Sequence, residues 1–457
     1  MRAFAIALAI VLAVPACNCG EAAVGESDAG VRDAGALDSG MGDAGDIDAG
    51  PTDGGPEDAG ELDAGPMDAG PEDAGEADAG PEDAGCFAGD DGGCPPVVAL
   101  TDAQVVCSGN YQPPTVVAAD GVYAVGCNPM GSQNVTPEVH IVDAQGTPLA
   151  THALYTADGY YYTDIQLGFH DGLIQALYEY NCDDNGSWQV GWGWNCIDRR
   201  VYARDGGVVS PSLVYGETGH NGHPVLAWSG SGFGTAWVSY DALYFRALDA
   251  NADFVDGGPG DNVLVAGSNG SDARNDARTK IAWSESAQGY GVFAIIGTEM
   301  YFTRVGPLGD IQVPATSVVG AWSQTFSGQF DVIASPDGFF VCDFDGSQVH
   351  FMKTDLQGSL VFNQVIQSGD FRFPTMFEAD GLFYVTSNDA NRQALLIAVD
   401  SSGSVVPERS VTLSPGTVMA FPMSAYEAAS RTLSVVSSDD TAWSGGNISL
   451  RHYHLNP

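Results

Sequence analysis

The sequence has little positive charge. Its 457 residues include 16 Lys and Arg against 59 Asp and Glu, and the formal net charge is −43. Such an acidic surface repels phosphate backbones, so we expect no nucleic-acid partner. Between Glu21 and Cys94 there is no aromatic residue before Phe87, and about 22 acidic residues accompany a single Arg. With so little apolar surface, residues 17–94 are predicted to form a disordered acidic linker.

Motifs of familiar enzymes are also missing. The chain has no phosphate loop or dinucleotide fingerprint, and no nucleophile elbow can be assigned. It has no Cys-x-x-Cys pair and no Cys/His ladder with zinc spacing, so we expect no cofactor and no transition-metal site. Six aspartates in predicted turns could bind calcium, although turn aspartates are more commonly solvated. Two of them, at 343 and 345, are close enough in sequence to suggest a pair of acids for glycoside hydrolysis. These aspartates are Asp183, Asp184, Asp343, Asp345, Asp439 and Asp440.

The first residues have the features of an export signal. Arg2 precedes an apolar run over residues 3–14, which is too short to span a membrane as a mature helix. The sequence Val-Pro-Ala-Cys at 14–17 resembles the lipobox of bacterial lipoproteins, which implies a signal peptide over 1–16 and lipid on Cys17. Pro15 departs from the usual Ala or Ser, and ordinary cleavage with secretion is the alternative. The resemblance, with Asn18, implies the outer membrane or cell surface, with a secreted or periplasmic protein as the other possibility. Several acyl chains anchor stably.

The linker is a pentapeptide repeat. An Asp recurs every five residues from Asp28 to Asp83, mostly as Asp-Ala-Gly. This period matches neither a helix nor a strand, and the spacings of calcium loops are absent. A coil of about 60 residues averages roughly 40 Å end to end. We interpret it as a tether, and it resembles the linkers of predicted surface lipoproteins in large-genome Gram-negative soil bacteria.

Eight cysteines remain beyond Cys17. In an exported, oxidising setting, short spacings favour three disulfides, Cys86 with Cys94, Cys107 with Cys127 and Cys182 with Cys196. Cys342 lies in the apolar run "GFFVCDF" and is predicted to be a buried free thiol. Cys19 is unassigned.

From residue 95 onward, a short turn followed by an apolar run occurs seven times. The copies begin at Ala119, His170, Gly230, Ala287, Ser335, Glu378 and Ala428, about 43 to 60 residues apart. Flanking strands give four per unit, which predicts an all-β fold over 95–457, a β-propeller with seven four-stranded blades. Six or eight blades stay open, as do tandem β-sandwiches. Asp-x-x-Gly turns follow three third strands, at Asp143, Asp355 and Asp400.

The seventh unit lacks a fourth strand. The chain ends at Pro457, just after its third strand, while the segment Pro95–Cys107 is an orphan strand pair. We predict that this segment completes the seventh sheet and that the Cys107 to Cys127 bond fixes it to the first blade. The sequence "SPDGFFV" at 335–341 resembles the turn of TolB-type propeller repeats, which supports the fold and no activity.

Second-to-third loops and blade-to-blade connections of a propeller share one face, here the long-loop face; the other turns form the short-turn face. Binding residues tend to gather in long loops on a rigid scaffold. The loop between Cys182 and Cys196 holds three tryptophans, which predicts a stacking surface for sugar rings or for an aromatic or proline-rich peptide. Packing of these indoles on a neighbouring loop is the alternative. The binding candidates are Trp188, Trp192, Trp194, His220, His223 and Trp443.

The two histidines would supply half of a metal site at most, and ordinary loop polar residues are the simpler interpretation. The sequence favours a non-catalytic, lipid-anchored module that binds a glycan or a protein and meets the membrane through its lipid alone. An extracellular polysaccharide hydrolase or lyase is one alternative. A structural component of outer-membrane assembly is the other.

Overall fold

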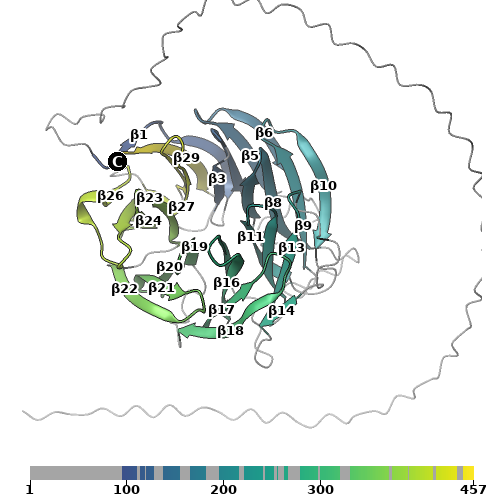
Figure 1. The fold of residues 1–457 in the computed structure, drawn as a ribbon. Helices are drawn as coiled ribbons and strands as arrows, with labels where there is room; N and C mark the ends of the chain where they lie inside the picture. Colours follow the sequence, from purple (N-terminus) through teal and green to yellow (C-terminus); the bar gives the residue numbers. More distant parts are fainter. Residues whose placement is uncertain are drawn as a thin grey trace, which may run out of the picture. The chain divides into compact units, whose positions relative to one another are not determined.

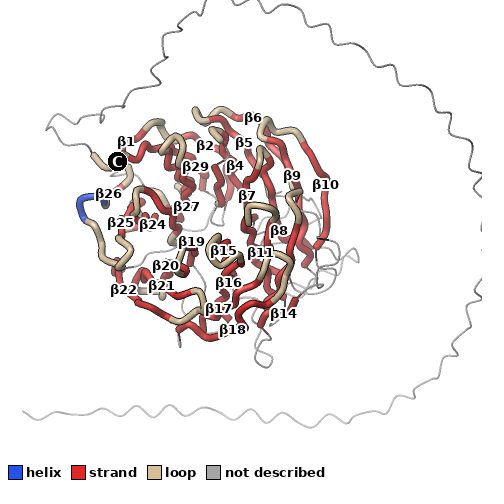
Figure 2. Tube along the Cα trace, viewed as in Figure 1, coloured by secondary structure: helices blue, strands red, loops and turns tan. Residues whose placement is uncertain are grey.

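The computed structural model describes residues 95–110, 114–118, 120–127, 137–154, 165–181, 195–215, 221–239, 242–251, 255, 262–265, 278–296, 299–319, 330–369, 373–389, 391–414, 418–439 and 446–457. They form a ring of seven antiparallel sheets (Figure 1). Figure 2 shows strands almost throughout, with one short 3₁₀ turn, η3 (Pro407–Arg409). In this part of the chain, no helix has the length and hydropathy that crossing a membrane requires. The predicted seven-bladed β-propeller is confirmed.

Blades 1 to 6 each contain four strands that pair in chain order. Blade 1 has β3 (Thr115–Ala118), β4 (Val122–Cys127), β5 (Glu138–Asp143) and β6 (Pro148–Ala153), and blade 2 has β7 (Ile165–His170), β8 (Leu173–Asn181), β9 (Asn195–Ala203) and β10 (Val208–Tyr215). Blade 3 has β11 (Asn221–Trp228), β12 (Phe233–Ser239), β13 (Ala242–Leu248) and β14 (Asn262–Val265), and blade 4 has β15 (Arg278–Ser284), β16 (Gly289–Ile296), β17 (Glu299–Val305) and β18 (Ile311–Val319). Blade 5 has β19 (Phe330–Ser335), β20 (Gly338–Phe344), β21 (Gln348–Asp355) and β22 (Leu360–Ser368), and blade 6 has β23 (Thr375–Ala379), β24 (Leu382–Asn388), β25 (Ala394–Val399) and β26 (Val411–Thr412).

Blade 7 is built from both ends of the propeller sequence. It takes β27 (Ala420–Glu427), β28 (Thr432–Ser438) and β29 (Gly446–Leu455) from the C-terminal end, and β1 (Val97–Ala99) and β2 (Gln104–Asn110) both pair with β29. Figure 1 shows β1 beside β29, next to the C-terminus. The side-chain amide of Asn456 donates to the carbonyl oxygen of Pro95 at 2.6 Å. The predicted closure of the ring is confirmed.

Two kinds of glycine-containing turn recur on the short-turn face. Asp-Gly pairs with positive φ at both residues join the first two strands of blades 1, 2 and 6, which is the conformation of a type I′ hairpin turn. In the three Asp-x-x-Gly turns, the carboxylate accepts backbone N–H groups two and four residues ahead. For Asp143 these come from Gln145 at 2.9 Å and Thr147 at 2.7 Å, and Gly146 has a φ of 78°. The predicted turns are present at Asp143, Asp355 and Asp400.

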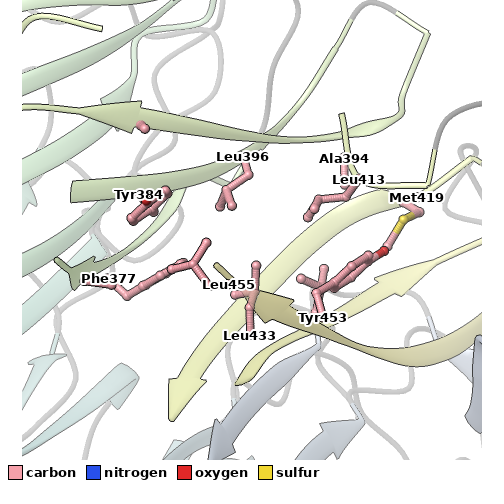
Figure 3. Close-up of a cluster of buried hydrophobic side chains, with 12 residues drawn as sticks. Phe377, Tyr384, Ala394, Leu396, Leu413, Met419, Leu433, Tyr453 and Leu455 are labelled. Carbon is pink, nitrogen blue, oxygen red and sulfur yellow. The ribbon is translucent and has the colours of Figure 1, made fainter. Parts of the chain in front are cut away.

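Apolar side chains of the inner strands hold neighbouring blades together. Figure 3 shows the cluster between blades 6 and 7, where Tyr384 and Leu396 meet Leu433, Tyr453 and Leu455. Each of these side chains is 2% exposed or less. Burying one such side chain contributes roughly 1.5–3 kcal/mol, so the blade-to-blade contacts supply much of the stability of the ring.

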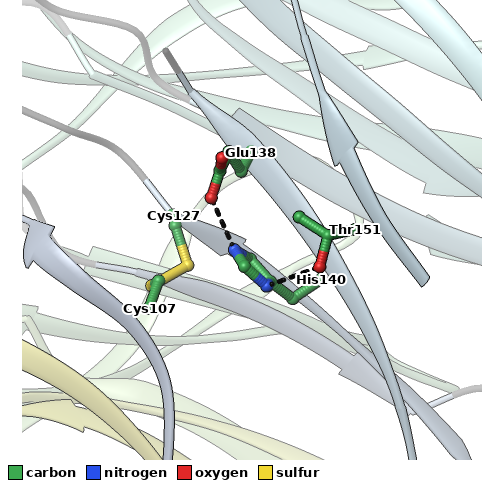
Figure 4. Close-up of a disulfide and its surroundings, with 5 residues drawn as sticks. All are labelled: Cys107, Cys127, Glu138, His140 and Thr151. Carbon is green, nitrogen blue, oxygen red and sulfur yellow. Dashed lines mark hydrogen bonds and ion pairs between the residues drawn. A yellow bond between two sulfur atoms is a disulfide. The ribbon is translucent and has the colours of Figure 1, made fainter. Parts of the chain in front are cut away.

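A disulfide joins the two ends of the ring. Cys107 of β2 and Cys127 of β4 are bonded, as predicted, so the bond crosses the seam between blade 7 and blade 1. Figure 4 shows His140 and Glu138 of β5 beside it, with His140 Nε2 2.9 Å from Glu138 Oε2. Cys342 of β20 is a buried free thiol, also as predicted, and burial raises the pKa of this thiol well above its usual value.

The short-turn face is less uniform than the sequence indicated. The third-to-fourth connections of blades 3 and 6 are long, over residues 249–261 and 400–410, where short turns were expected. In blade 6 the extra residues have a clear role, because η3 carries Arg409. Its guanidinium donates to the Tyr384 hydroxyl at 3.0 Å and to the Asn456 carbonyl oxygen at 2.5 Å. The longer connection thus braces the C-terminal end.

Candidate binding site on the long-loop face and inner wall

The second-to-third loops divide the long-loop face into two halves. In blades 7, 1 and 2 they cover residues 439–445, 128–137 and 182–194. In blades 3 to 6 they shrink to residues 240–241, 297–298, 345–347 and 389–393. Blades 7, 1 and 2 are consecutive in the ring, so the long second-to-third loops, including the tryptophan-rich one, belong to a single sector. Long blade-to-blade connections on this face also lead into blades 4 and 5, over residues 266–277 and 320–329.

Most of the binding residues predicted from the sequence lie outside the described residues. Cys196 falls in β9 and His223 in β11, but the tryptophan surface, the histidine pair and two of the predicted disulfides stay predictions. The lipid-attachment cysteine also lies outside. The residues outside the described ranges are Cys17, Cys19, Cys86, Cys94, Cys182, Asp183, Asp184, Trp188, Trp192, Trp194, His220, Asp440 and Trp443.

The first strands of the seven blades contact one another in succession and form the inner wall of the ring. In blades 4 and 5 this wall carries an ion pair near the long-loop end of the strands. Lys280 Nζ of β15 lies 3.6 Å from Asp331 Oδ1 of β19, and the two side chains are 25% and 22% exposed. Asp331 Oδ2 accepts the backbone N–H of Met376 of β23 at 2.9 Å. One carboxylate thus connects three blades and still reaches solvent.

Hydroxyl groups continue this polar wall in blades 6 and 7. Thr375 Oγ1 lies 2.8 Å from Ser424 Oγ, and Thr386 Oγ1 donates to Ser424 Oγ at 3.0 Å. We call Lys280, Asp331, Thr375 and Ser424 the inner-wall belt. Aliphatic side chains of the first strands of blades 1 and 3 pack into the hydrophobic clusters of the blades, among them Val116, Val117, Val225 and Leu226.

Asp343 and Asp345 have opposite environments although they are two residues apart. Asp343 is 1% exposed, and neither carboxylate oxygen has a hydrogen-bond partner among the described residues. Burial, assisted by the charge of Asp345, raises the pKa of Asp343 well above its usual value. Asp343 is therefore not the solvated turn aspartate that its spacing favoured. It is also closed to solvent, which argues against its use with Asp345 as a pair of hydrolytic acids.

Asp345 behaves as a turn aspartate. Its Oδ1 accepts the backbone N–H groups of Ser347 and Gln348, both at 2.8 Å, and His350 Nε2 lies 3.0 Å from its Oδ2. Partial burial acts to raise the pKa of Asp345, but these hydrogen bonds outweigh it and lower that pKa.

A buried polar cluster fixes the strands that carry the tryptophan-rich loop. The Tyr178 hydroxyl of β8 donates to Asp198 Oδ2 of β9 at 2.5 Å, and the backbone N–H of Arg199 donates to Asp198 Oδ1 at 2.7 Å. Burial, with the hydrogen bond to Asp198, raises the pKa of Tyr178 far above its usual value. The Arg200 guanidinium lies 5.9 Å from the centre of the Tyr178 ring. The loop over residues 182–194 therefore starts from a rigid base.

One group of metal-ligating side chains is close enough to share an ion in the described part of the chain: Cys107, Cys127 and His140. The two sulfur atoms are bonded to each other and are not thiolates, so the group as it stands is not a thiolate metal site.

No protein-family model and no curated protein matches the chain. Among solved structures, the WD40 domain of Toxoplasma gondii coronin is similar at 10% identity, with a TM-score of 0.47 over 79% of this chain and 86% of that chain. The Dos1 propeller matches at 9% identity, with a TM-score of 0.43 over 78% and 82%. Trypanosoma rangeli sialidase in complex with the inhibitor DANA matches at 9% identity, with a TM-score of 0.38 over 68% of this chain and 56% of that chain. All three scores lie below 0.5, and the propeller assignment rests on the strand pairing itself.

Proposed function

We propose that this protein is a lipid-anchored, extracytoplasmic β-propeller that binds a glycan or a protein partner through its long-loop face and catalyses no reaction. The observation that carries the proposal is the clustering of the long second-to-third loops on three consecutive blades. One of these loops holds three tryptophans within residues 182–194. Aromatic faces together with a few placed polar groups are the usual means of holding a sugar ring, and the inner-wall belt offers such polar groups.

A binding module fits better than a hydrolase. The adjacent acids that the sequence offered for glycoside chemistry are Asp343 and Asp345, and Asp343 is buried away from solvent. Hydrolysis of a glycosidic bond needs two carboxyl groups that flank the substrate.

The experiment for this function is a glycan array probed with a soluble chain from Asn18 onward, which lacks the lipid-attachment residue Cys17. Wild type is compared with Trp192→Ala and Trp194→Ala, and with Leu308→Ala, an exposed residue of the short-turn face, as the control. We expect a glycan signal from wild type and the control that falls in both tryptophan variants. Equal signals from all four proteins, or no signal from wild type, would contradict glycan stacking.

The anchor rests on residues 14–17 and on the repeat that follows. We expect an alkyne-tagged fatty acid fed to expressing bacteria to label wild type and not Cys17→Ser. Equal labelling of the two proteins, or none of either, would favour plain secretion.

A further inference from the structure

The chain contains two lysines, Lys280 and Lys353, and they have different surroundings. Lys353 of β21 lies towards the short-turn face, where its Nζ donates to Asp337 Oδ2 at 2.6 Å. Lys280 stands in the inner wall, and its ammonium group donates no hydrogen bond to any described residue. Because the Lys280 side chain is 25% exposed, its three ammonium donors reach solvent and are available to a ligand.

Asp331 supplies the matching acceptor. Its Oδ2 is held by the backbone N–H of Met376, while Oδ1 accepts no hydrogen bond from the described residues and lies 3.6 Å from Lys280 Nζ. That separation is longer than a direct hydrogen bond, so the donors of Lys280 and the free oxygen of Asp331 stay open to a third group. Each side chain lies on a strand that is paired within its own blade, with Lys280 opposite Phe293 and Asp331 opposite Cys342, and the strands β15 and β19 contact each other.

We propose that Lys280 and Asp331 form a subsite for two neighbouring hydroxyl groups of a neutral sugar. One hydroxyl oxygen accepts from the ammonium group, and the adjacent hydroxyl donates to Asp331 Oδ1. Both are hydrogen bonds to a charged group, which are about twice as strong as neutral ones. This inference rests on the proposed glycan binding and names the class of sugar.

The charges of the subsite select against acidic sugars. A carboxylate or sulfate placed on Lys280 would also face Asp331, and two like charges at that range repel each other. The subsite lies in blades 4 and 5, whose second-to-third turns are short, over residues 297–298 and 345–347. The blade-to-blade connections that lead into β15 and β19, residues 266–277 and 320–329, lie outside the described residues.

The test uses lysine-specific reductive dimethylation of the mature chain, followed by mass spectrometry of the two lysine peptides. The probes are cellotetraose, maltotetraose, xylotetraose and mannotetraose as neutral sugars, and tetragalacturonate as the acidic one. We expect the neutral sugar that binds to slow modification of Lys280 by about tenfold or more at saturation, while Lys353 reacts at an unchanged rate. This measurement needs no substitution and so does not depend on how a variant folds.

Matched variants give the second measurement. Lys280→Met and Asp331→Asn are each expected to weaken binding of that sugar by about tenfold, which is the scale of one hydrogen bond to a charged group. Lys353→Met, which breaks the other Lys–Asp pair of the chain, should bind as wild type does.

The outcomes separate the subsite from the proposed function. If wild type binds a neutral glycan and loses it in the tryptophan variants, yet Lys280 reacts equally with and without the sugar, the subsite is wrong and the proposed function stands. Protection of Lys280 by tetragalacturonate alone overturns the neutral class. If wild type binds no glycan, the proposed glycan binding fails, and the subsite fails with it.

Discussion

The ring of His452 of β29 packs against that of Tyr123 of β4 across the seam between blades 7 and 1, with centroids 4.4 Å apart and planes tilted by 44°. His452 is 1% exposed, and its Nδ1 lies 2.8 Å from the Ser434 hydroxyl. Burial lowers the pKa of His452 to about 4, although the charges of Asp143 and Glu427 act to raise it. The closing seam therefore contains a neutral imidazole.

This imidazole predicts a loss of stability in mild acid. The unfolded chain takes up a proton on His452 near pH 6.5 and the folded chain near pH 4, so the free energy of unfolding falls as the pH drops between these values. The full effect is about 3 kcal/mol. Urea midpoints at pH 7.5 and 4.5 would measure it for wild type and His452→Gln, and the variant should lose less stability than wild type. Parallel losses in the two proteins would place the acid sensitivity elsewhere.

Asp343→Asn is expected to stabilise the protein at neutral pH. Because burial raises the pKa of Asp343 in the folded chain, the protonated carboxyl group favours the folded state. This contribution to stability is fully present below about pH 4 and is lost as the pH rises towards the folded-state pKa. An amide of the same shape removes that loss, so the variant should gain on the order of 1 kcal/mol at pH 7 and nothing at pH 3. Thermal melts at the two pH values would measure the gain.

Asp345→Asn is the matched control for this position. Asp345 is ionised and accepts hydrogen bonds from Ser347 and Gln348, so its amide should cost about 1–2 kcal/mol at pH 7. Destabilisation by both substitutions would mean that Asp343 has a partner that stabilises its charged form.

Loss of the Cys107–Cys127 bond should weaken the seam. The bond closes a sequence separation of 20 residues, which corresponds to about 3 kcal/mol in the chain-entropy description. We expect the double variant Cys107→Ser, Cys127→Ser to unfold at lower urea concentration with an unchanged denaturant dependence. A variant as stable as oxidised wild type would show that β2 is held by strand pairing alone.

Two ion pairs of the short-turn face should differ in strength. The guanidinium group of Arg431 donates two hydrogen bonds to the carboxylate of Asp380, at 2.9 and 2.5 Å. Its Nε donates to the carbonyl oxygen of Leu455. A double-mutant cycle to Ala for Asp380 and Arg431 should give a coupling of about 1 kcal/mol or more. The cycle for the more exposed pair of Lys353 and Asp337 should give less, in the range of about 0–1 kcal/mol. The reverse order would argue against the bidentate geometry.

The fold was largely predictable from the sequence because short local turn motifs mark the boundaries of its strands. Asp-Gly and Asp-x-x-Gly turns require positive φ at fixed positions, so turns such as Asp171-Gly172 mark strand ends without knowledge of the rest. Closure followed from counting, since the seventh unit lacked a strand and Pro95–Cys107 had no sheet.

No local sequence motif marks the residues of the inner-wall belt. Lys280 and Asp331 are 51 positions apart in the chain, and their distance depends on how the neighbouring blades 4 and 5 pack against each other. The contrast between Asp343 and Asp345 was equally hidden, because it depends on where the strand ends: Asp343 lies within β20, whereas Asp345 lies in the turn that follows it. The long loops of the binding face were located from the sequence, and their side-chain arrangement lies outside the described residues.

The pairing of β1 with β29 sets the order in which the protein can be finished. Val97, near the start of the propeller, has its backbone partner in Leu455, next to the end of the chain. A chain that is synthesised from its N-terminus must hold its first strand unpaired until the last strand has been made, and joining ends so distant in sequence is slow. Loss of β29 by truncation at the C-terminus would leave β1 and β2 without a pairing strand, and the ring could not close.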